Sequence, residues 1–357
     1  MRSQLRIVIL GLSITSSWGN GHATTYRGLV RELSARGHEV LFLERDRLWY
    51  AANRDLSTIP CVRIELYASL QQLKDRFAGD VRQADVVIVG SYVPEGVAVG
   101  EWVTATSRGL TVFYDIDTPV TLAKLGRGDI EYLSPALIPR YALYLSFTGG
   151  PTLEHLEQRY GARRALPLYC AVDPHVYYPE PSVKRWDLGY LGTYSPDRQP
   201  ALKTLFVEPA RHWPQGRFVV AGSLFPSTLA WPANVEQIEH LPPAEHRAFY
   251  NAQRFTLNIT RADMVRAGYS PSIRLFEAAA CATPIISDYW PGLDMLFMPG
   301  KEILVADAPE KAMSYLRELP ESDRAAIGRR AQVRVLGEHT AAHRAAELEA
   351  YIWDLQP

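Results

Sequence analysis

One carboxylate stands in an otherwise apolar stretch in the second half of the chain. Glu277 follows SPSIRLF and precedes AAACATPIISD. On a helix it lies on the side of Ile273 and Ala280, where a carboxylate is costly unless hydroxyl groups donate hydrogen bonds to it. A ribose diol is such a donor. A different possibility is an ion pair with Arg274, three residues earlier, on a half-exposed helix face.

The residues just before this carboxylate favour an anion. Ser270 can serve as a helix N-cap with Pro271 at the first helical position. The free N–H groups of such a helix end, together with the Ser272 hydroxyl, can face a negative charge. The sequence therefore predicts a diphosphate site at the start of this helix.

A second group of candidate phosphate contacts lies outside that helix. Gly192 and Thr193, in GYLGTYSPDRQ, follow an apolar run, and a glycine there lets the backbone approach a phosphate. Arg198 can reach the same oxygens, and Arg261 in NITRAD is another candidate donor contact. A plain turn and a surface arginine would give the same sequence.

A histidine is the most reactive candidate in the first half of the chain. His22 follows Gly21 in SSWGNGHATTYRG, after an apolar run and before a helical pattern. An imidazole titrates near neutral pH and can take a proton from a hydroxyl group. Gly19 and Gly21 lack the third glycine of a dinucleotide fingerprint, which disfavours NAD binding. A histidine that only caps the helix would fit the same position.

Short apolar runs, separated by helical or loop segments, predict the elements that position these residues. They cover residues 5–12, 39–43, 85–89, 110–114 and 143–147, and then 187–191, 217–221, 235–240, 255–259, 284–287 and 302–305. This alternation is typical of parallel sheets covered by helices on both faces. Such sheets bind ligands beyond the carboxyl ends of their strands. We therefore expect two Rossmann-like α/β domains that face a cleft.

The proline-rich stretch VDPHVYYPEPSVKRW predicts an interdomain linker. We expect domains at residues 1–175 and 176–335, with a helix over 336–357 that packs back on the first domain. From Pro309 onward the sequence is rich in Ala, Arg and Glu, and a helical C-terminal part is predicted.

The composition narrows the class of protein. The formal net charge of the 357 residues is -1 with scattered basic residues, which is unlike a nucleic-acid binder or a basic membrane helix. Three distant cysteines argue against structural zinc and fit a reducing compartment. The start, MRSQLRIVILGL, lacks a cleavage site and predicts a buried strand, and no run is long enough to span a bilayer. A cytoplasmic location is expected.

The segment FEAAACATPIISD resembles the nucleotide-sugar-binding helix of GT-B-fold glycosyltransferases. The resemblance implies that Glu277 holds the donor ribose and that Ser270 and Ser272 lie at the pyrophosphate. In the large retaining branch a second Glu stands eight positions earlier, where this chain has Tyr269, so the chain departs from that branch. The segments YDIDTPVT, SFTGGPTLEHLE and WDLGYLGTYSPDRQPAL are most similar to those of the CgeB-like, spore-maturation-type bacterial enzymes.

The same resemblance implies an acceptor side in the first domain. The spacing from His22 to RGHEV looks like the helix of inverting GT-B enzymes whose histidine deprotonates the acceptor hydroxyl. Asp115 and Asp117, in TVFYDIDTP, mimic the DxD that holds a metal in GT-A enzymes. Because the nucleotide signature lies in the other domain, we expect no metal and predict that this pair orients His22 or an acceptor hydroxyl. Further acceptor-side candidates are Gly21, Gly149 and Gly150.

The predicted activity is metal-independent transfer of a sugar from a UDP-, dTDP- or GDP-linked donor to the hydroxyl of a glycan, protein or small molecule. No cofactor beyond this co-substrate is expected. Inversion with His22 as the base and Asp117 beside it is the preferred mechanism. A retaining reaction stays open, because the leaving phosphate can then take the proton. Two further classes stay open as well, namely a sugar-nucleotide epimerase of the same fold and a catalytically silent nucleotide-binding protein.

Overall fold

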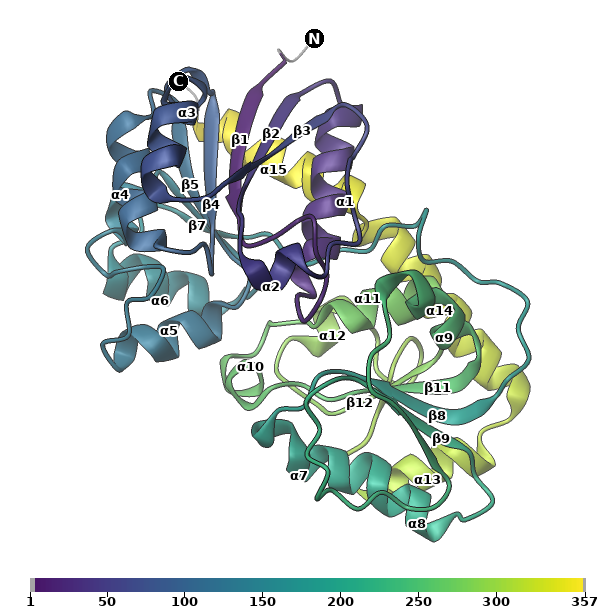
Figure 1. The fold of residues 1–357 in the computed structure, drawn as a ribbon. Coiled ribbons are helices and arrows are strands. Elements are labelled where there is room, and N and C mark those ends of the chain that lie inside the picture. The colour runs from purple at the N-terminus through teal and green to yellow at the C-terminus, as the bar shows by residue number, and fades with distance from the viewer. Residues whose placement is uncertain (1–3, 356–357) are drawn as a thin grey trace. The chain divides into compact units, whose positions relative to one another are not determined.

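The structure is a computed structural model that describes residues 4–355. The chain forms two compact α/β units, shown as a ribbon in Figure 1. The first unit comprises the chain up to Cys170 together with the residues from Ala341 onward, and the second runs from Ala171 to Thr340. The domain boundaries predicted from the sequence lie a few residues from the two points where the chain passes from one unit to the other.

The first unit is built on a parallel sheet. In the described residues it has seven strands in the order β3-β2-β1-β4-β5-β6-β7. They are β1 (Arg6–Gly11), β2 (Glu39–Arg45), β3 (Val62–Tyr67), β4 (Val86–Gly90), β5 (Leu110–Asp115), β6 (Leu143–Ser146) and β7 (Ala165–Pro167). The five predicted runs of this half are all strands. The apolar pattern does not predict β3 and β7, because β3 is a partly exposed edge strand and β7 has only three residues.

Helices alternate with these strands along the chain. They are α1 (His22–Ala35), α2 (Leu48–Ala51), α3 (Leu70–Gln83), α4 (Gly96–Thr106), α5 (Thr118–Gly126), the 3₁₀ turn η1 (Ile138–Arg140), α6 (Pro151–Tyr160) and α15 (Ala341–Leu355). The apolar side chains of α1 are buried at helical spacing, among them Tyr26, Leu29 and Leu33. This burial explains why α1 packs on the sheet.

The C-terminal helix α15 belongs to the first unit, where it lies beside α1 (Figure 1). The Arg36 guanidinium donates two hydrogen bonds to the Glu349 carboxylate, at 2.8 and 2.9 Å. His38 Nε2 lies 2.7 Å from the same carboxylate. Gly28 and Ala341 pack so closely that a Cβ added at Gly28 would lie 3.0 Å from the Ala341 Cβ. Polar contacts and close packing therefore hold α15 to the start of the chain.

The second unit has a parallel sheet of its own. Its six strands in the described residues have the order β10-β9-β8-β11-β12-β13. They are β8 (Trp186–Leu191), β9 (Phe218–Ala221), β10 (Val235–Ile238), β11 (Gln253–Asn258), β12 (Ile285–Ser287) and β13 (Leu304–Val305). Each overlaps one of the six runs predicted for this half. Buried side chains such as Leu188, Phe255 and Ile286 form its core.

Helical segments again separate these strands. They are η2 (Pro196–Arg198), α7 (Gln199–Leu202), η3 (Lys203–Val207), α8 (Glu208–His212), α9 (Pro243–Asn251), α10 (Ala262–Ala267), α11 (Ile273–Ala280), α12 (Leu293–Leu296), α13 (Pro309–Glu318) and α14 (Glu321–Glu338). Since all strands of a unit run in one direction, the loops that follow them gather at one edge of that sheet.

Candidate functional site

A cluster of three arginines lies at the carboxyl ends of β8 and β11, which are neighbours in the sheet of the second unit. Arg274, in the first turn of α11, donates from Nη1 to Asn258 Oδ1 at 3.0 Å and from Nε to the Leu191 carbonyl. Arg198 and Arg261 follow β8 and β11. The positive charges of Arg274 and Arg261 both act on Arg198. The fold thus brings together the two arginines that the sequence predicts as phosphate contacts and Arg274, which the sequence offers only as an ion-pair partner of Glu277.

The cluster has unused hydrogen-bond donors. The Nε atoms of Arg198 and Arg261 are buried and have no hydrogen-bond partner in residues 4–355. Arg261 Nε lies 4.0 Å from Asp197 Oδ2, beyond hydrogen-bond distance. Burial lowers the pKa of the Arg198 guanidinium, and the charges of Arg274 and Arg261 act in the same direction. A bound anion would satisfy these donors and relieve the repulsion among the three charges.

The Gly192–Thr193 turn passes close to the same cluster. A Cβ at Gly192 would lie 2.7 Å from Arg274 Nη2, so a larger side chain would displace that guanidinium. The Thr193 carbonyl accepts a long contact of 3.5 Å from Arg198 Nη1. Gly192 therefore leaves room for the Arg274 guanidinium, and the approach of a phosphate to this turn stays a prediction.

The predicted helix start at Ser270 is wrong. The N-cap of α11 is Ser272, with φ -87° and ψ 148°, and the first helical residue is Ile273. The Ser272 hydroxyl donates to Asn258 Oδ1 at 2.7 Å. Ser270 is only 1% exposed, so its hydroxyl does not face solvent. The end of α11 still faces the arginine cluster through Arg274 and Asn258.

Glu277 is buried at 4% exposure, four residues into α11. Its Oε2 accepts a hydrogen bond of 3.2 Å from the Tyr250 hydroxyl and lies 3.9 Å from His246 Nδ1. Arg274 turns away to Asn258 and the Leu191 carbonyl, so the ion pair between Arg274 and Glu277 does not form. The hydroxyl-donor environment expected from the sequence is therefore present, although here a tyrosine supplies it.

Sequence reasoning missed the groups that surround Glu277. His246 Nε2 bonds the Leu241 carbonyl at 3.1 Å, and the Tyr177 hydroxyl lies 3.3 Å from His246 Nδ1. Burial raises the pKa of Tyr177 and of Tyr250, and the charge of Glu277 raises both further, so these hydroxyls stay protonated as donors. Tyr250 lies on α9 and is 27 residues from Glu277, a separation without any local pattern.

In the first unit the structure brings His22 and Asp117 together. His22 is the first residue of α1, and Asp117 is the N-cap residue of α5. His22 Nε2 lies 3.7 Å from Asp117 Oδ2, and the two side chains are 24% and 13% exposed. The same Oδ2 accepts a hydrogen bond of 2.9 Å from the Tyr92 hydroxyl, a residue that the sequence does not indicate. A partly exposed imidazole with a carboxylate beside it has the composition of a general base.

Asp115 has a different environment. It is fully buried, and its carboxylate accepts hydrogen bonds from the Tyr144 hydroxyl at 2.5 Å and the Thr121 hydroxyl at 2.9 Å. Burial raises the pKa of Asp115 to about 6. It also accepts from the backbone N–H of Asp117. Asp115 therefore supports the position of Asp117 from inside the protein, and this geometry does not support its predicted contact with an acceptor.

The three acceptor-side glycines lie in loops that follow strands. Gly21 is exposed at the N-cap of α1, and Gly150 has φ 59° at the N-cap of α6. Gly149 is buried, and a Cβ there would lie 2.0 Å from the Tyr169 hydroxyl. The absence of a side chain at Gly149 is thus explained by packing against Tyr169.

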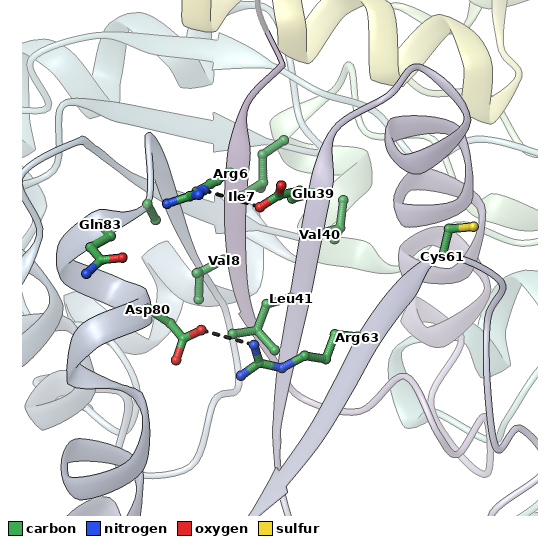
Figure 2. A pocket seen from close by; sticks show the side chains of 11 residues that line it. Arg6, Ile7, Val8, Glu39, Val40, Leu41, Cys61, Arg63, Asp80 and Gln83 are labelled. Carbon is green, nitrogen blue, oxygen red and sulfur yellow. Dashed lines mark hydrogen bonds and ion pairs between the residues drawn. The ribbon is translucent and has the colours of Figure 1, made fainter.

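A pocket of about 350 Å³ lies elsewhere in the first unit, where β1 and β2 begin (Figure 2). Ion pairs of 3.2 Å, Arg6 with Glu39 and Arg63 with Asp80, cross it. Its lining contains none of the predicted site residues.

Among residues 4–355 no group of three or more His, Cys, Asp or Glu side chains is arranged to hold a metal ion. In the same part of the chain, every helix is too short or too polar to cross a lipid bilayer.

The second unit carries a family resemblance that covers most of the donor-side candidates. Residues 198–350 match a family model described as "Glycosyl transferase-like". No curated protein sequence matches the chain. The matched part begins at Arg198 and includes Arg261, Arg274 and Glu277.

Solved structures match almost the whole chain. HepE from Anabaena, in complex with UDP and glucose, is 12% identical with a TM-score of 0.72, covering 98% of this chain and 100% of that one. Sucrose-phosphate synthase from Thermosynechococcus elongatus is 14% identical with a TM-score of 0.69, covering 98% of both chains. An alpha-glucosyltransferase in complex with UDP and a 13-mer DNA is 14% identical, with a TM-score of 0.66 and coverage of 98% and 99%. The predicted GT-B fold is confirmed, and with the family match it bears out the predicted enzyme class, a glycosyltransferase.

Proposed function

We propose that this protein transfers a sugar from a nucleoside diphosphate donor, held by the second unit, to an acceptor hydroxyl at the first unit. The observation that carries the proposal is the arginine cluster Arg198, Arg261 and Arg274, which has unused buried donors, in the same unit as the buried carboxylate of Glu277. A nucleoside diphosphate has a matching pair of groups, an anionic diphosphate and a ribose diol.

The two parts of the donor suit the two parts of this site. The guanidinium groups would neutralise the diphosphate and stabilise the charge that develops on it as the sugar leaves. Glu277 would accept hydrogen bonds from the ribose hydroxyls. Since relatives of the same fold hold UDP or UDP with glucose, a UDP-sugar is the first donor to test. The likeness to the CgeB-like enzymes remains part of this proposal.

On the acceptor side, His22 would take the proton of the attacking hydroxyl, with Asp117 beside it to stabilise the imidazolium. This is a single displacement that inverts the anomeric centre. The arginines would take the role that a metal ion has at the diphosphate of other glycosyltransferases, so the proposal requires no metal.

A thermal-shift panel of UDP, GDP and dTDP and their sugars tests the donor. A ligand at 100 times its dissociation constant stabilises the folded state by about 2.7 kcal/mol. We expect UDP compounds to raise the melting temperature. If no nucleoside diphosphate does so at millimolar concentration, the donor assignment is refuted. NMR of the best donor incubated alone then separates a transferase from an epimerase, because only an epimerase converts the sugar without an acceptor.

A further inference from the structure

The order of the sheet in the first unit places one loop between the two proposed reactive residues. In the sheet β4 lies between β1 and β5 and pairs with both. The loop that leads to His22 follows β1, and Asp117 follows β5. The loop after β4, which carries Tyr92, therefore emerges between them at the same edge of the sheet.

The backbone of this loop is strained. Tyr92 has φ 63°, in the left-handed region, and Glu95 has φ 56°. Bulky L-residues rarely adopt this conformation, because their Cβ crowds the neighbouring carbonyl. Strain of this kind persists only where the surroundings hold the residue in place, and it concentrates at functional sites.

The Tyr92 side chain contacts both members of the pair. Its hydroxyl donates to Asp117 Oδ2 at 2.9 Å, the oxygen that lies 3.7 Å from His22 Nε2. Its ring stacks on the His22 imidazole, with centroids 6.2 Å apart and planes inclined by 24°. The Tyr92 ring also packs against Tyr132, with centroids 4.7 Å apart, and Lys124 Nζ lies 5.7 Å from its centroid.

We infer that Tyr92 is a positioning residue for proton transfer: it fixes Asp117 Oδ2 through its hydroxyl and the plane of the His22 ring through stacking. The inference rests on the proposed function of His22. Tyr92 does not touch substrate in this role and acts only through the pair. This positioning role accounts for the left-handed backbone of Tyr92. The loop after β4 has to direct the Tyr92 ring toward the imidazole and its hydroxyl toward the carboxylate.

The hydroxyl and the ring are separable by substitution. Tyr92→Phe keeps the ring and removes the bond to Asp117, and Tyr92→Leu removes both. Tyr141→Phe is the matched control, because it makes the same change on a buried tyrosine of this unit whose hydroxyl has no partner in residues 4–355.

The first measurement is kinetic. Tyr92→Phe should lower kcat by about tenfold or more with little change in KM, since it removes a hydrogen bond to a charged group. Tyr92→Leu should lower it further, and Tyr141→Phe should leave it unchanged. In a His22→Ala background Tyr92→Phe should have no further effect, because residues that act as a unit are not additive. Additive losses in the double variant would refute the inference while leaving His22 as the base.

The second measurement does not depend on turnover. The His22 ring signal, assigned by its loss in His22→Ala, is followed by NMR as the pH changes. In Tyr92→Phe the midpoint should move to higher pH, because the freed Oδ2 can approach the protonated imidazole. An unchanged midpoint overturns the inference, whatever the activity. Failure of the proposed function has a different signature, namely full turnover in His22→Ala or a retained anomeric centre.

Discussion

The hydroxyl of Tyr250 lies 3.2 Å from Oε2 of Glu277, in a buried environment where a carboxylate is otherwise costly. This contact shows how the unit keeps a charged group inside an apolar helix face. The contact also shows that this carboxylate accepts a hydrogen bond from an O–H group. A ribose hydroxyl is a donor of the same kind as the tyrosine hydroxyl.

Replacement of Glu277 by Gln should weaken nucleotide binding while the fold persists. A hydrogen bond to a charged group is worth about 1.5–3 kcal/mol, so affinity for UDP should fall by at least about tenfold. Isothermal titration calorimetry measures this directly. Glu245→Gln, an exposed position on α9, is the control and should bind as the parent does. Equal affinities for all three proteins would refute the ribose contact.

Removal of the Arg198 or Arg261 side chain should weaken only the binding of the phosphate groups of the donor. We expect each alanine variant to lose about tenfold in affinity for UDP, about 1.4 kcal/mol, and to leave the affinity for uridine unchanged. Arg266→Ala, an exposed arginine on α10 paired with Asp263, is the control. If uridine binding falls by the same factor as UDP binding, these arginines are structural and do not contact phosphate.

Chelation tests the role of metals. Because the three arginines can balance the diphosphate charge, turnover should survive an excess of EDTA. Loss of activity that manganese restores would contradict this prediction and would direct attention back to Asp117 and its neighbours.

His22→Ala should lower turnover by about 10²–10⁴-fold with little change in donor affinity, since proton transfer contributes to the transition state and not to ground-state binding. The rate alone is not decisive, because a mispositioned acceptor also slows a retaining enzyme. NMR of the product decides: an inverted anomeric centre is expected, and a retained centre excludes a single displacement with His22 as base.

The contact between α15 and α1 should depend on pH. The hydrogen bond from Arg36 lowers the pKa of the Glu349 carboxyl below its ordinary value near 4.5, and His38 acts in the same direction. A depressed pKa stabilises the fold above that ordinary value, and the stabilisation is lost as the pH falls through the folded-state value.

Glu349→Gln should therefore lower the melting temperature at pH 7 by several degrees, at about 2–4 °C for each kcal/mol lost. The difference from the parent should shrink as the pH falls through the lowered folded-state pKa of the Glu349 carboxyl, because the parent side chain then also becomes protonated. Melting curves from pH 3 to 8 measure both effects. A difference that stays constant over this range would mean that packing, not charge, holds the helix.

The chain pattern by itself determined the two parallel sheets. Strands that are buried on both faces are continuously apolar, as IVILG at residues 7–11 of β1 is, and this signal is local. The sequence could also point to Glu277, Arg198 and His22 as candidates, because their signals are local too. Each of these residues follows a strand or stands alone on an apolar helix. By contrast, the edge strand β3 is partly exposed, which leaves it without such a signal.

Tertiary structure alone decided which partners these residues take. Arg274 is three residues from Glu277 and could have paired with it, but Asn258 and the Leu191 carbonyl bind it instead. Tyr92 is 25 residues from Asp117, and only the order of β1, β4 and β5 brings its hydroxyl to that carboxylate. Hydrogen bonds depend on positions in space to within fractions of an ångström. Local sequence specifies the elements, whereas their packing specifies those positions.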